Sequence, residues 1–370
     1  MNFWSKLSKP IIALSPMDGV TDAAYRYITA KHGSPDIHFT EFTNVEGLAR
    51  NAILMLDDFL YSEIERPVVA QIYGSEPESF YKIAIVVCEL GFDGIDLNMG
   101  CPAKKVAARG CGAGLIQNPS LAKEIIRSVK RGIHDWVNGK GVEDLGFKQK
   151  MLRRVGEMNR ERMGKDRMGE RKMLPVSVKT RIGYDSVVIE DWVQHLLEED
   201  PVAISIHGRT LKQMYTGQAD WEAIRRAAAI IHQSKTLVLG NGDLNSVADM
   251  VDKIRSSGVD GVLLGRGSLG NPWIFQQKEK VRALVKDTQG SVESESPVDA
   301  QKRFEVLMEH ARYFEKIRGQ RRFAGMRKHF GWYCKRMPQA AELRNRMCRS
   351  SSSQEVAEII KDYRESYPNI

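Results

Sequence analysis

The amino-acid sequence predicts an α/β protein, a (β/α)8 TIM barrel followed by a C-terminal helical bundle domain. Eight apolar, β-branched runs recur over about 270 residues, and segments with helical periodicity separate most of them. Continuous apolar strands that alternate with helices are typical of parallel strands covered on both faces. Each run also ends in polar or glycine-rich positions. In a barrel the carboxyl ends of the strands converge on one mouth, where active sites are built.

The elements follow one another in a regular order. The predicted strands cover residues 10–19, 37–42, 67–74, 94–100, 175–183, 203–210, 236–243 and 261–267. The helices predicted between them include Glu76–Leu90, Ser120–Lys130, Trp221–His232 and Ser246–Ser256. We therefore expect a barrel domain over residues 1–275, a linker over 276–299 and a helical domain over 300–370.

A charged insertion interrupts the barrel at about residues 134–173. It holds eleven Lys and Arg residues against seven Asp and Glu residues. Met151, Val155 and Met158 recur at helical spacing among good helix formers, which predicts an amphipathic helix. The sequence leaves two interpretations open: a helix docked on the barrel, or an added element that contacts RNA or a protein partner.

The composition excludes several classes of protein. Of 370 residues, 42% are hydrophobic and 28% are charged, and no apolar run approaches the roughly 18 residues that span a bilayer. The N-terminus does not resemble a signal peptide, so we expect a cytoplasmic protein that does not bind membranes. Five cysteines without CxxC spacing argue against disulfides and a zinc site, and we expect no metal. The net charge of +8 suggests a polyanionic partner.

Two glycine-rich endings predict a phosphate site at the last two strands. These are LGNGDL (239–244) and LGRGSLG (264–270), and barrels often bind phosphate between these two loops. Arg266 adds a cationic group. The second motif also fits GxGxxG, but a Rossmann fold needs a further βαβ unit, and a polar helical stretch follows instead. A mononucleotide such as FMN is the simplest occupant.

Polar residues at the ends of the other strands suit a flavin ring. Gln71 and Asn98 can bond the edge of a flat heterocycle, and Lys179 can place positive charge near the N1–C2 carbonyl region. Cys101 lies between a glycine and a proline at a strand end, where Pro102 keeps it out of the core. Its thiol suits a proton donor if it stays protonated. Lys104 and Lys105 follow closely, and the sequence leaves that condition open.

At this point the ordered motifs resemble a known family. PMDGVTD, QIYGSEP, DGIDLNMGCPAKKV, VKTRIG, IHGRT, GNGD and GRGSLGNPWIF are similar to segments of the dihydrouridine synthases, FMN-dependent enzymes that reduce uridine in tRNA. The similarity resumes at MRKHFGWYCK (326–335), which resembles the C-terminal domain of the bacterial B-type branch. Two features depart from the family pattern: Asp18 replaces the usual alanine of PMAG, and the 134–173 insertion is longer than usual.

The resemblance implies a role for each matching residue. Cys101 would be the catalytic acid, with Lys179 and His207 also catalytic. The residues that would bind the cofactor are Pro16, Met17, Asp18, Gln71, Asn98, Lys179, His207, Asn241, Gly242, Asp243, Gly265 and Arg266. Those that would bind the substrate are Asn98, Arg181, Arg209, Arg327 and Lys328. NADPH would be the electron donor, and the D-loop of tRNA is the expected target.

The C-terminal sequence suits RNA binding. Residues 316–337 hold eight Lys and Arg residues and no Asp or Glu, interleaved with Phe323, Phe330, Trp332 and Tyr333. A basic, aromatic surface suits phosphates and exposed bases. The alternatives are a solvated basic helix with buried aromatics, the same chemistry on ribosomal RNA, a small-molecule flavin reductase, or an RNA-binding barrel with a relic flavin. We expect a monomer.

Overall fold

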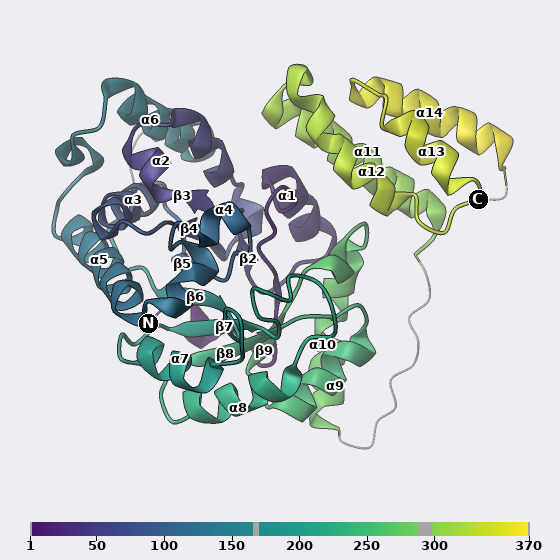
Figure 1. Ribbon diagram of the computed structural model, residues 1–370. Coiled ribbons are helices and arrows are strands. Elements are labelled where there is room, and N and C mark those ends of the chain that lie inside the picture. Colours follow the sequence, from purple (N-terminus) through teal and green to yellow (C-terminus); the bar gives the residue numbers. More distant parts are fainter. Residues whose placement is uncertain (1, 166–169, 288–297, 369–370) are drawn as a thin grey trace.

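The computed structural model describes residues 2–165, 170–287 and 298–368, and its centre is a parallel barrel (Figure 1). The strands are β1 (Ile11–Leu14), β2 (His38–Phe39), β3 (Thr43–Asn44), β4 (Val68–Tyr73), β5 (Gly94–Met99), β6 (Val176–Arg181), β7 (Ala203–His207), β8 (Leu237–Asn241) and β9 (Gly261–Leu264). Eight of them lie in the order β1-β9-β8-β7-β6-β5-β4-β2, β3 also pairs with β4, and every pair is parallel. The Leu14 N–H donates to the Ile37 carbonyl at 3.1 Å, which joins the two ends of the path. The predicted barrel is confirmed.

The second predicted strand is shorter than expected. Only His38–Phe39 and Thr43–Asn44 pair with β4, whereas the prediction was one strand over 37–42. Between these pieces the Gln71 N–H donates to the Thr40 hydroxyl at 2.9 Å. The side-chain oxygen of Thr40 therefore accepts a backbone hydrogen bond that a carbonyl oxygen would accept if the two strands paired without interruption.

Helices follow the strands and cover the outside of the barrel. Around the barrel lie α1 (Ala23–His32), α2 (Val45–Ala49), α3 (Pro77–Glu89), α4 (Lys104–Ala107), α5 (Pro119–Val137), α6 (Gln149–Met163), α7 (Ile189–Leu197), α8 (Trp221–Ile231), α9 (Val247–Ser257) and α10 (Lys278–Lys286). Local sequence explains several boundaries, because Asp22, Asp220 and Ser246 each accept a backbone N–H in the first turn of their helix.

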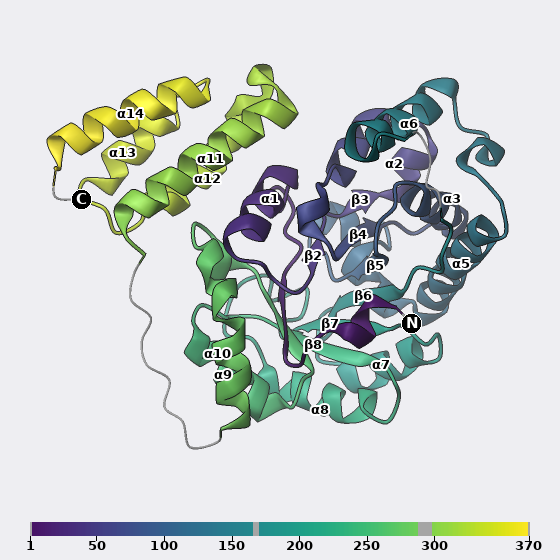
Figure 2. The same ribbon diagram turned by 180° about the vertical axis from the view of Figure 1, so that it is seen from behind.

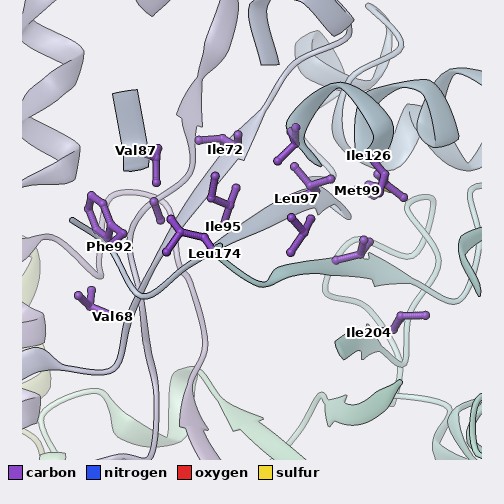
Figure 3. Packing of buried hydrophobic residues seen from close by; sticks show 14 of the residues in the cluster. Val68, Ile72, Val87, Phe92, Ile95, Leu97, Met99, Ile126, Leu174 and Ile204 are labelled. Atoms are coloured by element: carbon purple, nitrogen blue, oxygen red, sulfur yellow. The ribbon is translucent and has the colours of Figure 1, made fainter. Parts of the chain in front are cut away.

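The core lies between the strands and these helices. Figure 3 shows part of it, where Ile72, Leu97 and Met99 of β4 and β5 lie beside Val87 of α3 and Ile126 of α5. All five side chains are buried. Strands β4 to β6 are buried along almost their whole length in the middle of the molecule, and because they are parallel, their carboxyl ends come to one edge.

The insertion docks on the barrel. Met151, Val155 and Met158 of α6 are buried, and the Asn159 side-chain amide donates to the Glu89 carbonyl of α3 at 2.9 Å. Arg154 of α6 lies 3.3 Å from Asp57 in the short helix η2 (Ile53–Phe59). The docked amphipathic helix is thus present, and contact of its outer face with RNA or a protein partner stays a prediction. Residues 166–169 of the insertion lie outside the described residues.

The first part of the expected linker, residues 276–299, is a helix in the structure. Residues Lys278–Lys286 form α10, which packs on α9 with Val281 fully buried. Arg282 of α10 donates to the carboxylate of Asp36 at 2.6 Å, at the amino end of β2. This helix therefore completes the barrel. Residues 288–297 of the expected linker lie outside the described residues.

The C-terminal residues form a helical bundle beside α1, as Figure 2 shows from behind. Its helices are α11 (Ala300–Arg318), α12 (Arg327–Tyr333), α13 (Ala340–Met347) and α14 (Ser353–Ser366). Its core takes in Ala24 and Ile28 of α1 together with Trp273. Tyr27 of α1 stacks on Tyr313 of α11 with ring centroids 3.9 Å apart. The predicted helical domain is thus present and shares a hydrophobic interface with the barrel.

Among the described residues, no helix has both the length and the apolar character needed to cross a membrane.

Candidate active site

A cavity of about 560 Å³ opens at the carboxyl ends of the barrel strands. Its volume lies within the roughly 300–1,000 Å³ range of small-molecule and cofactor sites. The predicted site residues that line it are Pro16, Met17, Asp18, Gln71, Asn98, Cys101, Lys179, Arg181, His207, Asn241, Gly242, Asp243, Gly265 and Arg266. The fold thus brings residues from seven segments of the sequence to one hollow.

A chain of buried hydrogen bonds supports one wall of the cavity. The Ser177 hydroxyl donates to Asp96 at 2.6 Å, and the Gln71 amide donates to the other Asp96 oxygen at 2.6 Å. The Asn98 amide then donates to the Gln71 oxygen at 2.9 Å. These bonds fix the orientations of both amides, so that Asn98 Oδ1 faces the backbone N–H groups of Gly100 and Cys101.

Asp96 and Ser177 support this wall from behind, and the sequence reasoning did not single them out. Asp96 is fully buried, and burial raises the pKa of its carboxyl to about 6 despite the bonds from Ser177 and Gln71. The sequence GIDLNM contained a clue to the position of Asp96. Asp96 and Asn98 are two residues apart on a strand, so their side chains point to the same face.

Cys101 lies at the cavity wall in the loop after β5. The Cys101 N–H donates to Asn98 Oδ1 at 2.8 Å, and its carbonyl accepts from Ala113 at 3.2 Å. A side chain at Gly112 would come within 2.9 Å of the Cys101 Cβ, and Gly112 has φ +56°, so glycine is required there. The loop is therefore packed closely around the thiol.

The pKa of the Cys101 thiol lies above its ordinary value, which favours the protonated form. Burial is the main cause of this raised pKa, and the charge of Asp18 adds to it, whereas a hydrogen bond from the backbone N–H of Ala103 and the charges of Arg181 and Lys179 oppose it. Lys104 and Lys105 are exposed to solvent, where water screens their charge. Burial therefore favours the protonated thiol that the proton-donor role requires.

Lys179 and His207 lie on neighbouring strands. Burial and the charge of Arg181 lower the pKa of Lys179 to about 8, and its ammonium lies 3.4 Å from Asn241 Oδ1. Burial and the surrounding cations hold the pKa of His207 well below its ordinary value. Arg209 lies 3.4 Å from His207 Nε2, and an arginine can only donate, so the proton of the neutral ring is assigned to Nδ1.

Two arginines hold the loop that follows β7. Arg181 donates to the Gly100 carbonyl at 2.7 Å and to the Thr210 carbonyl at 3.1 Å, so it joins the Cys101 loop to this segment. Arg209 is 2% exposed and does not line the cavity; it donates to the Gly217 carbonyl and to both oxygens of Asp243. Its contacts are those of a residue that positions the loop.

The lining residues that were not predicted include Phe42, Met214 and Tyr215. Met214 and Tyr215 of the same loop border the cavity, and Tyr215 is 62% exposed. Phe42, between β2 and β3, borders it from the opposite part of the barrel. Loop aromatics carry no periodic signal, so the sequence offered no means of placing them beside the strand ends.

The glycine-rich loops lie beside each other as expected. Arg266 donates to Asp243 at 2.9 Å, and its side chain is 57% exposed. Gly242 has φ +132°, and a Cβ there would lie 2.6 Å from that of Ala219. A Cβ at Gly267 would lie 2.4 Å from the Leu244 carbonyl oxygen. Only glycine allows these two loops to approach so closely.

Arg327 and Lys328 belong to the helical domain and do not line the cavity. Both are exposed at the start of α12. Lys328 lies 3.2 Å from Asp22, four residues after Asp18 of the cavity wall. The start of α12 therefore borders the barrel mouth on the β1 side.

Known proteins resemble this chain along almost its whole length. The family model described as "Dihydrouridine synthase (Dus)" matches residues 12–140 and 166–367. A "Probable tRNA-dihydrouridine synthase" of Staphylococcus aureus strain COL is 31% identical over 98% of this chain and 95% of its own. A "Probable tRNA-dihydrouridine synthase 2" of Bacillus subtilis strain 168 is 31% identical over 99% of this chain and 98% of its own. Among solved structures, a DHODH of Eimeria tenella overlaps with a TM-score of 0.48, at 11% identity, over 75% of this chain and 82% of that one.

Proposed function

Because this chain belongs to the dihydrouridine synthase family and is an oxidoreductase, we propose that it reduces the C5–C6 bond of uridines in tRNA to 5,6-dihydrouridine. The observation that carries the proposal is a protonated, buried thiol at the wall of a cavity rimmed by cations. A thiol in that state can give a proton to carbon chemistry that begins with hydride addition. The curated relatives match from end to end, which supports the same activity for the whole chain.

The cavity suits a flavin mononucleotide. The glycine loops after β8 and β9 would take the phosphate, with Arg266 and Asn241 at their edge. Asn98 and Gln71, oriented by the buried Asp96, would bond the ring edge. Lys179 would place its charge beside the ring, where reduction adds negative charge. NADPH is the proposed electron donor.

Different side chains of the cavity would serve different steps of the reaction. When bound, a reduced flavin supplies the hydride that adds to C6 of the uracil. The Cys101 thiol gives its proton to C5 and regains one from solvent. Lys179, as an ammonium, and the neutral N–H of His207 stabilise the negative charge that develops on the C4 oxygen. Arg181 and Arg209 hold the two loops that surround the reacting base.

The helical domain would hold the tRNA by its backbone. Its basic strip consists of the exposed residues Lys316, Arg321, Arg322, Arg327, Lys328, Lys335 and Arg336. Phosphate contacts by such side chains give strong, sequence-independent binding. A target base is stacked in folded RNA, so it must be turned out to enter the cavity, at a cost of a few kcal/mol that backbone contacts offset.

The proposal is tested by mapping dihydrouridine across total RNA from cells with and without this protein. We expect the modification to disappear from defined tRNA positions and to return when the wild-type chain is restored. Unchanged dihydrouridine in every tRNA would contradict the proposal. Loss confined to ribosomal RNA would redirect the same chemistry to another substrate.

A further inference from the structure

Three side chains with metal-binding atoms meet where the helical domain contacts the barrel. Asp22 precedes α1, His310 lies on α11 and His329 lies on α12. Their ligand atoms lie within 4.8 Å of one another. All three residues are buried, with exposed fractions of 3%, 0% and 0%. The cluster is thus assembled from three separate elements and exists only when the helical domain is docked.

The histidines in this cluster have buried ring nitrogens without hydrogen-bond partners. These atoms are Nε2 of His310 and both nitrogens of His329. Such orphaned polar atoms are rare in folded proteins and call for an explanation, of which an ion is one. The other nitrogen of His310, Nδ1, lies 3.1 Å from the Tyr333 hydroxyl. Metal-bound histidines characteristically use their second nitrogen in this way, which fixes the ring.

The charge states suit metal binding. Burial lowers the pKa of both His310 and His329, so each ring is neutral and keeps a lone pair. The Asp22 carboxylate faces the Lys328 ammonium at 3.2 Å, and this cationic neighbour favours its ionised form. Two neutral imidazoles and one carboxylate form a ligand set typical of divalent transition metals.

We propose that Asp22, His310 and His329 bind one divalent transition-metal ion that fastens the helical domain to the barrel. His329 Nε2 lies 3.7 Å from Asp22 Oδ2. Zinc ligands at about 2.0–2.1 Å in a tetrahedron are separated by about 3.4 Å, so small side-chain movements suffice. Three protein ligands leave one position for water. The ion would be structural, because the cluster includes no residue that lines the reaction cavity.

Lys328 competes with the metal in this arrangement. Its ammonium lies 3.2 Å from Asp22 Oδ2, and its side chain is one-third exposed, so it can withdraw to solvent. In the metal-free protein it neutralises the carboxylate. Replacing it by an uncharged residue, Lys328→Met, removes the competing charge and is therefore expected to tighten zinc binding.

The experiment uses the full-length protein, stripped of metal by a chelator and dialysed against zinc. We expect one equivalent of Zn²⁺ per chain by elemental analysis, and a melting temperature that rises with zinc concentration. His310→Gln and His329→Gln should lose this binding. Tyr333→Phe should weaken it about 10- to 100-fold, because Tyr333 orients His310. His38→Gln is the matched control, since His38 is equally buried and its ring nitrogens also lack partners.

Two results would overturn the proposal. The first is a stripped wild-type protein that takes up no stoichiometric zinc at micromolar concentration and melts at the same temperature with and without it. The second is zinc binding that is equally strong in wild type and in folded His310→Gln or His329→Gln protein, which would assign the ion to surface groups. The first result needs no variant, so a variant that fails to fold leaves the test intact.

Discussion

At the scale of single residues, the proposed chemistry rests on the state of Cys101. The sequence placed this thiol at a strand end but left its protonation open, because its neighbours Lys104 and Lys105 are cationic. In the folded chain those lysines are solvated, and the thiol is only 6% exposed. Burial thus outweighs the local sequence, which shows why adjacent residues alone could not predict the pKa.

Replacing the thiol should separate the two half-reactions. We expect Cys101→Ala to keep its flavin and to oxidise NADPH at close to the wild-type rate, but to lose at least 100-fold in uridine reduction, the order of a general-acid contribution. Single-turnover assays of each half-reaction measure both effects. Cys111→Ala is the control, because Cys111 is also buried but does not line the cavity. Uridine reduction by Cys101→Ala at the wild-type rate would disprove the role of this thiol.

Lys179 should set the alkaline limb of the pH profile. Its pKa of about 8 lies below that of Cys101, so the ammonium is the first of the two groups to lose its proton as pH rises. We therefore expect kcat for uridine reduction to fall above about pH 8. Lys179→Arg should move that limb to higher pH, because arginine stays protonated. An unchanged limb in Lys179→Arg would show that another group titrates there.

At the scale of elements, predictions succeeded where apolar periodicity was strong. Strands β4 to β9 lie within their predicted ranges, because continuous apolar runs have few alternative structures in a chain of this size. Helix α10 was read as linker, since only Val281 and Arg282 among its nine residues are buried. Strand β2 ends at Phe39, and the Thr40 hydroxyl accepts a hydrogen bond from the Gln71 N–H. The pattern of apolar residues gives no sign of such a side-chain contact.

The docked insertion helix should contribute to stability through its apolar face. Met151 of α6 is fully buried, and Met151→Ala should lower the free energy of unfolding by about 2–5 kcal/mol, the usual cost of emptying a core position. Lys150→Ala, at the adjacent exposed position, should change it by less than about 0.5 kcal/mol. Urea unfolding monitored by tryptophan fluorescence provides both values. Equal effects would mean that α6 is not held in place by this face.

At the scale of the whole molecule, the barrel supplies the cavity and the helical domain supplies the basic strip. The sequence indicated this division and left two interpretations of residues 316–337 open: basic and aromatic residues on one RNA-binding surface, or a solvated basic helix with buried aromatics. In the structure Phe323, Phe330 and Tyr333 are buried in the helical domain, and Trp332 is half-buried. Three of the four aromatics therefore build the core, and the charged residues and part of Trp332 remain outside. The sequence held this separation open as an alternative, whereas the Asp22–His310–His329 cluster joins residues too far apart in the chain to be predicted.

The basic strip should determine how strongly tRNA binding depends on salt. We expect Arg321→Gln together with Lys335→Gln to weaken binding to all tRNAs and to reduce the slope of log K against log[salt] by about two, one per lost phosphate contact. Lys6→Gln with Lys235→Gln removes equal charge at the amino-terminal end of the barrel and should leave the slope unchanged. Equal effects of the two pairs would assign binding to net charge instead of to the strip.

The central claim is that electrons pass from NADPH through a bound flavin to uridine in tRNA. The most direct measurement is flavin absorbance of the purified protein, first after NADPH in the absence of oxygen and then after unmodified tRNA is added. We predict bleaching by NADPH, followed by recovery of the oxidised spectrum and formation of one dihydrouridine per flavin reoxidised. Bleaching that tRNA fails to reverse, or a protein that NADPH does not bleach, would contradict the account.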